Sequence, residues 1–160
     1  MVRRRDFLTG SLSNLGVLLW WAGAVAAVLA AYTRRRDKRA VPLLAAGVLT
    51  GWLAVDDLYM LHETFFPPRG IWERMAVGAY AVVALAYVVI FRDFLRRSEW
   101  ILAVTAGALL ASSAVMDGLG IGTATWEESA KFLGIVGWTA FLVRAAVSRL
   151  AEPRTVGRSA

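Results

Sequence analysis

The sequence contains a long run of uncharged, mostly apolar residues that extends from Phe7 to Thr33. A helix needs about 20 apolar residues to cross about 30 Å of hydrocarbon, so this run is long enough to cross a lipid bilayer. Hydrophobic residues make up 58% of the whole chain, which exceeds the share that ordinary soluble domains carry. Both observations predict an all-α integral membrane protein.

Four further apolar runs follow the first one. Three of them, residues 40–55, 75–91 and 100–116, contain no charge and are extended by neighbours of mixed character. The last run, residues 132–143, reaches spanning length only when its flanking residues are included. We therefore predict a single transmembrane domain, a compact bundle of five transmembrane helices followed by a short cytoplasmic tail at 151–160, with helices near residues 7–33, 40–65, 72–92, 99–118 and 126–150.

Residues that end or begin helices lie between these segments. Pro67 and Pro68 follow the second segment, and proline cannot continue a helix. Thr125 is followed three residues later by Glu128, which is the pattern of a capping box. The pattern predicts that the fifth helix begins at Thr125, with Glu128 in a structural role.

Small residues recur at every fourth position of several predicted helices, where they would let neighbouring helices approach closely. These small-residue faces are Ala22, Ala26 and Ala30, Gly47 and Gly51, Gly107 and Ala111, and Ala130 and Gly134. They favour close packing, both within one bundle and between bundles. Because five helices are few for a monomeric carrier, we expect a homo-oligomer or a membrane-protein partner.

Composition excludes several classes of function. The chain has no cysteine, which excludes disulfides, thiol catalysis and an iron–sulfur cluster, and its single histidine argues against haem. The net charge of +6 comes from short Arg and Lys clusters between apolar runs. That distribution is typical of membrane topology, so we expect the lipid bilayer as a partner and no nucleic acid.

The basic residues divide unequally between the two sides of a five-span bundle. One side would carry Arg34, Arg35, Arg36, Lys38, Arg39, Arg92, Arg96, Arg97, Arg149, Arg154 and Arg158, and the other Arg3, Arg4, Arg5 and Arg69. Cytoplasmic loops are enriched in Arg and Lys, so the first side should be cytoplasmic. We expect a multi-pass protein of the plasma membrane, in a bacterial inner membrane, with a cytoplasmic C-terminus.

The N-terminal residues Arg4 and Arg5 resemble the core of a twin-arginine export signal. Cleavage after the first segment would leave the basic cluster at 34–39 outside the cytoplasm, against the positive-inside rule. We therefore expect an uncleaved first helix with a basic flank at the headgroups.

Seven of the twelve acidic residues lie at predicted helix ends on the side opposite the basic clusters, namely Asp56, Asp57, Glu63, Glu73, Asp117, Glu127 and Glu128. Asp56 and Asp117 are each about 25 Å from the cytoplasmic start of their helices, near the outer edge of the hydrocarbon. Ionisable groups at this depth are disfavoured by a few kcal/mol unless they face the bundle interior or water. The acids are therefore candidates for function.

Helix geometry divides these acids between faces. At about 100° per residue, Asp56, Tyr59 and Glu63 share one face of the second segment, whereas Asp57 and His62 point away from it. On the fifth segment Lys131 lies within one turn of Glu127 and Glu128. On the fourth, Ser113 stands one turn before Asp117.

We expect an outward-facing site for a cation or proton where the second, fourth and fifth segments converge. Asp56, Glu63, Asp117 and Glu127 would form it, supported by Asp57, Tyr59, His62, Ser113, Glu128 and Lys131. Carboxylates suit calcium, magnesium or manganese, and a metal set of Asp56, His62, Glu63 and Asp117 would permit zinc. The alternative interpretation is structural: headgroup-level charges, caps and pairs such as Glu127 with Lys131.

The sequence is compatible with three functions. The first is a channel, carrier or sensor that binds a cation or proton at the acidic site. The second is an intramembrane metal-dependent hydrolase acting on a lipid-like substrate through a metal-bound water. His62-Glu63 is similar to the start of a metalloprotease motif, but Phe66 stands where the second histidine is needed. The third is a non-catalytic subunit of a larger membrane complex.

Overall fold

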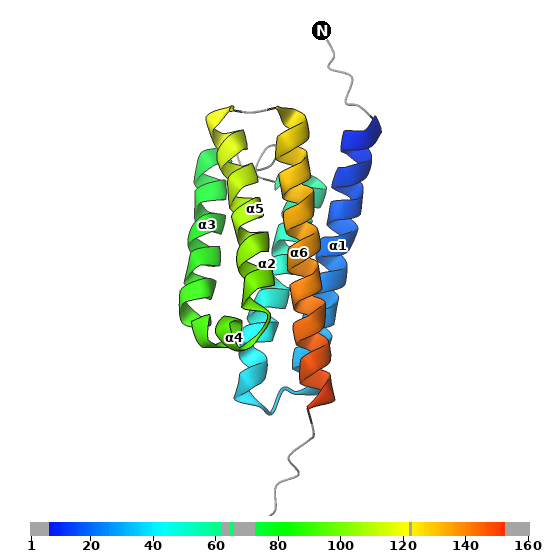
Figure 1. Cartoon of the computed structure of the whole chain (residues 1–160), viewed down its shortest axis with the longest axis vertical. Coiled ribbons are helices and arrows are strands. Elements are labelled where there is room, and N and C mark those ends of the chain that lie inside the picture. The colour runs from blue at the N-terminus through cyan, green and yellow to red at the C-terminus, as the bar shows by residue number, and fades with distance from the viewer. Residues whose placement is uncertain (1–6, 62–64, 66–72, 122, 153–160) are drawn as a thin grey trace, which may run out of the picture.

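The computed structural model describes residues 7–61, 65, 73–121 and 123–152. These residues form helices and no strand, which confirms the predicted all-α class for this part of the chain. The helices are α1 (Phe7–Thr33), the 3-10 turn η1 (Lys38–Ala40), α2 (Val41–Tyr59), α3 (Glu73–Ile90), α4 (Arg92–Arg97), α5 (Trp100–Leu119) and α6 (Ala124–Ala151). The five long helices run roughly along one axis (Figure 1).

Four helices within the described residues are long and apolar enough to cross a membrane, by length and composition. They are Leu12–Thr33 in α1, Lys38–Tyr59 with α2, Trp100–Leu119 as α5 and Thr125–Ala151 in α6. The apolar part of α3, Met75–Ile90, is shorter. The short run at 132–143 suggested that the fifth segment would be the shortest. The shortest apolar helix is instead the third segment.

The main packing runs from α2 through α1 and α6 to α5, each helix lying against the next. Glycine makes two of these contacts possible. A Cβ added at Gly47 of α2 would come within 2.8 Å of Val28 Cγ2 and 3.1 Å of the Ala24 carbonyl oxygen on α1. A Cβ at Gly134 of α6 would come within 2.8 Å of Leu110 Cγ on α5. Close helix approach depends on the missing side chains at both positions.

Not every predicted small-residue face packs inside the bundle. On α1 the buried alanines are Ala24, Ala27, Ala30 and Ala31, whereas Ala22 is exposed. On α5 a Cβ at Gly107 would meet no other described atom within 4 Å, and Ala111 is exposed. The spacing of one small residue at every fourth position identifies small-residue faces, but it does not determine whether each face packs against a neighbouring helix.

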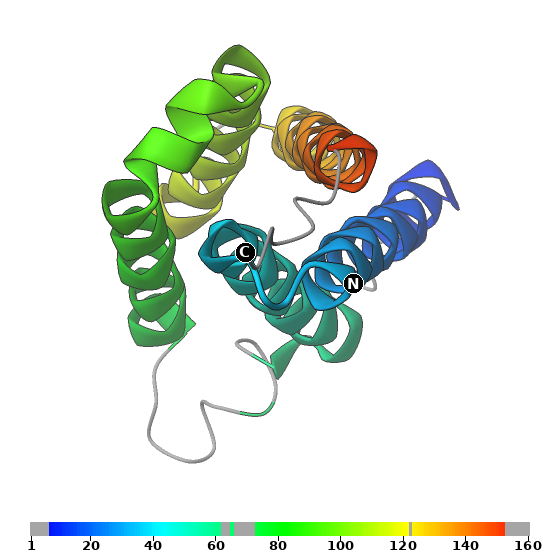
Figure 2. The same cartoon turned by 90° about the horizontal axis from the view of Figure 1, so that it is seen from below.

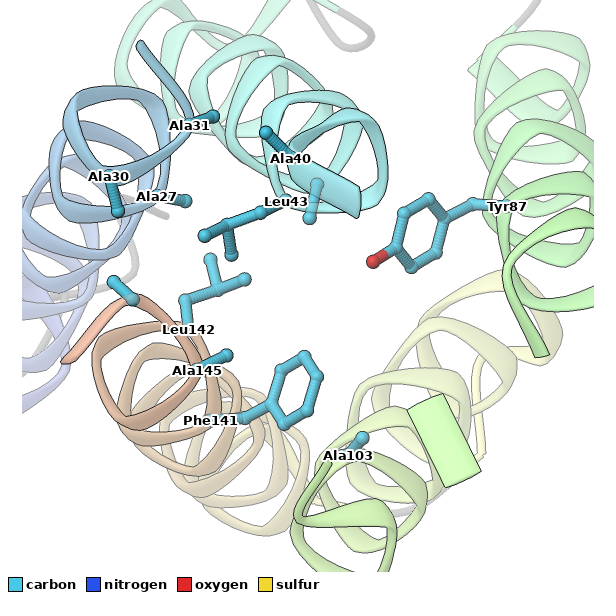
Figure 3. Close-up of a cluster of buried hydrophobic side chains, with 12 residues drawn as sticks. Ala27, Ala30, Ala31, Ala40, Leu43, Tyr87, Ala103, Phe141, Leu142 and Ala145 are labelled. Carbon is cyan, nitrogen blue, oxygen red and sulfur yellow. The ribbon is translucent and has the colours of Figure 1, made fainter. Parts of the chain in front are cut away.

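The largest core cluster lies between α1, α2 and α6, where Leu43, Phe141 and Leu142 are fully buried. Figure 3 shows Tyr87 of α3 pointing toward this cluster from the opposite side, with Ala103 of α5 beside Phe141. The Tyr87 ring meets the Trp138 ring edge to face at a centroid distance of 6.3 Å. Aromatic contacts therefore attach α3 to the core.

Apart from that contact, α3 lies at the edge of the bundle and packs only sparsely against α2. Figure 2 shows α2 lying between α3 and α1. The outward side chains of α3 are apolar, and Val82, Leu85, Val89 and Ile90 are all more than 60% exposed. In water this surface would be unfavourable, whereas lipid or a partner helix would suit it.

Two predicted helix ends need correction. The second helix ends at Tyr59 and not near residue 65, because Met60 adopts a left-handed backbone with φ 49° and ψ 46°. Helix α6, the fifth predicted segment, is capped by Thr123, whose side chain accepts a hydrogen bond from the Trp126 backbone N–H. Thr125 therefore already lies inside the helix. The capping box of Thr125 with Glu128 is therefore wrong.

Several sequence features lie outside the described residues. They include the twin-arginine-like tail at Arg4 and Arg5, the Pro67-Pro68 pair, and the tail at 153–160. His62 and Glu63, which belong to the expected site, also lie outside them.

Candidate functional site

The fold gathers charges of opposite sign at opposite ends of the bundle. The end formed by η1, α4 and the last turns of α6 carries Arg34, Arg35, Arg36, Lys38, Arg39, Arg92, Arg96, Arg97 and Arg149 (Figure 1). We call it the basic end. The last turns of α2 and α5 and the first turns of α6 carry Asp56, Asp57, Asp117, Glu127 and Glu128, and we call this the acidic end.

Asp56 connects α2 to α3 at the acidic end. Its side chain is buried, at 5% exposed, and one of its oxygens accepts a hydrogen bond of 2.9 Å from the Tyr80 hydroxyl. Because α3 packs sparsely, this bond contributes to holding it to the bundle. A carboxylate acceptor makes such a bond stronger than a neutral one.

Asp57 connects α2 to α6 instead. Its Oδ1 forms an ion pair and hydrogen bond with Lys131 Nζ, and the Asp57 side chain is only 12% exposed. The two adjacent aspartates thus face different helices, as their 100° separation on α2 requires. Helix spacing predicted that Lys131 lies near Glu127 and Glu128 of its own helix. The structure shows that it also pairs with Asp57 of α2.

The second carboxylate oxygen of Asp57 is in an unusual position. Asp57 Oδ2 is buried and has no hydrogen-bond partner among the described residues. A buried acceptor that lacks a donor costs about 1–3 kcal/mol, and more when the group is charged. An unpaired buried oxygen therefore needs an explanation, such as a bound proton or cation.

The Asp57–Lys131 pair belongs to a polar seam between α2 and α6. Two turns away, Trp138 Nε1 on α6 donates a hydrogen bond of 2.9 Å to Thr50 Oγ1 on α2. The two contacts are separated by seven residues on each helix, which is the spacing that returns to the same helix face. We refer to these four residues as the α2–α6 seam.

The remaining acids lie closer to the surface. Asp117 is exposed in the last turn of α5, and Glu127, in the first turn of α6, is near enough to Asp117, Glu128 and Lys131 to interact with their charges. Ser113 does not offer an oxygen to Asp117: its hydroxyl donates to the Glu127 backbone carbonyl at 3.1 Å. Ser113 joins α5 to α6.

The structure thus separates most of the expected site residues. Asp56 lies toward α3, Asp57 toward α6, and Asp117 and Glu127 at the junction of α5 and α6. Within the described ranges no three His, Cys, Asp or Glu side chains come together as a metal site. The proposed metal set also needs His62 and Glu63, which fall outside those ranges.

Three residues of this region were not expected in the site, namely Tyr80, Thr50 and Trp138, although helix spacing puts Trp138 on the same face of its helix as Lys131. Tyr80 is a hydroxyl-bearing residue within an otherwise apolar run, and Thr50 lies seven residues before Asp57 on the same face of α2. Both signals were present in the sequence. Their partners depend on which helices are neighbours, which the spacing does not reveal.

Comparison with known proteins gives a family and no function. No curated protein and no solved structure matches the chain. One family matches residues 2–145, which is most of the sequence and includes every residue of the α2–α6 seam. The chain belongs to the family described as Domain of unknown function (DUF8692).

Proposed function

We propose that this chain is a five-span protein of the plasma membrane that takes up a proton or small cation at Asp57, as the responsive element of a carrier, channel or sensor. The observation that carries the proposal is the buried Asp57 Oδ2, which has no partner among the described residues while Oδ1 is held by Lys131. Ionisable groups inside membrane helices are costly, and they mark ion pathways and proton relays in membrane proteins.

Five spans follow from adding α3 to the four longer apolar helices. At 18 residues α3 extends about 27 Å, close to the hydrocarbon thickness. Its exposed apolar side chains suit lipid. The short helix α4, with Phe94 and Leu95 packed on the core and Arg92, Arg96 and Arg97 exposed, suits the membrane surface.

The membrane orientation follows from the two ends. The basic end faces the cytoplasm under the positive-inside rule, in a bacterial inner membrane, and the acidic end faces outward. An odd number of spans leaves the C-terminus on the cytoplasmic side. Asp57 then lies near the outer boundary of the hydrocarbon, where an ion can reach it from the outer solution.

The chemistry at Asp57 is an exchange of partners. A proton or cation that binds the carboxylate weakens its ion pair with Lys131. Lys131 then has other acids within reach, because Glu127 stands one turn away on α6 and interacts with its charge. Occupancy of Asp57 thereby changes the contact between α2 and α6, which is the motion that a carrier or sensor needs.

The test is a thermal-unfolding titration of the detergent-purified protein with sodium, calcium, magnesium, manganese and zinc. A cation that binds only the folded state raises the unfolding temperature in proportion to the logarithm of concentration over Kd. We expect Asp57→Asn to remove this response, and Asp93→Asn, an exposed acid at the basic end, to keep it. A response that survives in Asp57→Asn would refute a cation site there.

The metal set of a hydrolase would include His62 and Glu63, which lie outside the described ranges. A role as a subunit of a larger complex has one observation in its favour, which is the exposed apolar side of α3. Purification under mild detergent tests it: a second protein in constant ratio would support the subunit role, and a single species or homo-oligomer would support the carrier or sensor.

A further inference from the structure

A second feature lies at the basic end, beyond the α2–α6 seam. A pocket of about 770 Å³ opens between the start of α2, helix α4, the start of α5 and the last turns of α6. Its volume falls within the range of small-molecule sites, about 300–1,000 Å³. The pocket is therefore large enough for a headgroup and the first part of its chains.

The side chains that line this pocket carry a net charge of +1, because four arginines stand against Asp93, Glu99 and Glu152. Arg144 is paired with Glu99 at 2.6 Å, and Arg149 with Glu152 at 2.9 Å. Arg39 and Arg97 also line the pocket, and neither has an acidic partner for its guanidinium among the described residues. Two guanidinium groups with unused donors point to an anionic ligand, because this group matches phosphate oxygens in pairs.

Apart from Asp93, Ser98 and Ser148, the rest of the lining is apolar. Phe94 of α4 and Trp100 and Ile101 of α5 contribute to the pocket, and Trp100 and Ile101 are 52% and 65% exposed. A free phosphate ion gains nothing from these side chains. A molecule with a phosphate and acyl chains would place its charge between the arginines and its chains along α5.

From the charge and the apolar lining together we infer that this pocket binds the headgroup of an anionic phospholipid of the cytoplasmic leaflet, held by Arg39 and Arg97. The inference rests on the membrane placement given under the proposed function, and it is independent of Asp57. Headgroup binding at this position ties the loop after α1, helix α4 and the end of α6 together at the membrane surface.

The test measures the unfolding temperature of the purified protein with micelles containing phosphatidylglycerol, with phosphatidylcholine, and with inorganic phosphate alone. We expect phosphatidylglycerol to stabilise the protein and the other two to have little effect. The Arg39→Gln/Arg97→Gln variant should bind phosphatidylglycerol about tenfold more weakly or worse, since each arginine near an anionic headgroup strengthens binding several-fold.

The matched control is Arg36→Gln/Arg96→Gln, which removes two exposed arginines of the same loop and the same helix that do not line the pocket. It should keep wild-type lipid binding. Equal losses in both variants would show charge attraction without a site, and full stabilisation by inorganic phosphate would show a soluble-anion site; either result overturns the inference. Native mass spectrometry of bound lipid provides a second readout if a variant unfolds.

Failure of this test and failure of the proposed function are distinguishable. Recovery of the chain without detergent would contradict the membrane placement itself. If only the cation response at Asp57 is absent, the lipid measurement at the opposite end still stands on its own.

Discussion

The acidic and basic ends of the bundle use charge in different ways. At the acidic end, Asp56 is buried and the Asp57 side chain is 12% exposed, and each is bound to a different neighbouring helix. At the basic end, the Arg144–Glu99 pair is 63% and 48% exposed. Buried ion pairs hold helices in one arrangement and are costly to break, whereas exposed pairs contribute little. The difference indicates that the acidic end sets how the helices meet, while the basic end leaves arginines available to the surroundings.

The largest expected effect comes from removing the partner of Asp57. Lys131→Met leaves the Asp57 carboxylate, whose side chain is 12% exposed, without its counter-charge. We expect a loss of about 2–3 kcal/mol in unfolding free energy. The double variant Asp57→Asn/Lys131→Met removes both charges and should recover a large part of that loss. Chemical or thermal unfolding of the four members of this cycle measures the coupling. Additive losses would show that the pair does not hold α2 to α6.

A smaller effect is expected at the link between α2 and α3. Tyr80→Phe removes one hydroxyl and leaves buried Asp56 with one donor fewer, which should cost about 1.5 kcal/mol. Because α3 packs sparsely elsewhere, hydrogen exchange in α3 should accelerate more than in α1. Tyr32→Phe is the control, since Tyr32 is 62% exposed near the basic end. Equal losses of stability from Tyr80→Phe and Tyr32→Phe would contradict the stabilising role of the Tyr80–Asp56 hydrogen bond at the acidic end.

The smallest effect is expected at the basic end. Arg144→Gln breaks an exposed pair with Glu99 and should change the unfolding free energy by no more than about 0.5 kcal/mol. Raising the salt concentration should lower the stability contributed by this pair and leave the less exposed Asp57–Lys131 pair less affected. A loss from Arg144→Gln as large as that from Lys131→Met would contradict the comparison.

The helices were largely predictable from the sequence because charge-free runs of spanning length have few other solutions. Two ends were not. Met60 ends α2 through a left-handed backbone that its residue type does not signal, and Thr123 caps α6 although Thr125 has the better matching motif. The choice between two nearby caps depends on how the preceding loop enters the helix.

The candidate site was predictable only in part. Helix periodicity separated Asp56 from Asp57, since adjacent residues point about 100° apart. It could not assign their partners, because Tyr80 and Lys131 meet them only after the helices have packed. Asp57 was therefore expected as a supporting residue, whereas its buried, unpartnered oxygen now makes it the centre of the proposed site.

The most direct test of the central claim is infrared difference spectroscopy on the purified protein, with and without added protons or the stabilising cation. Uptake at Asp57 predicts a component of the carboxylate band change that is present in the wild type and in Asp93→Asn and is absent in Asp57→Asn. If the band change of Asp57→Asn is identical to that of the wild type, uptake occurs at other acids and the proposed site is wrong.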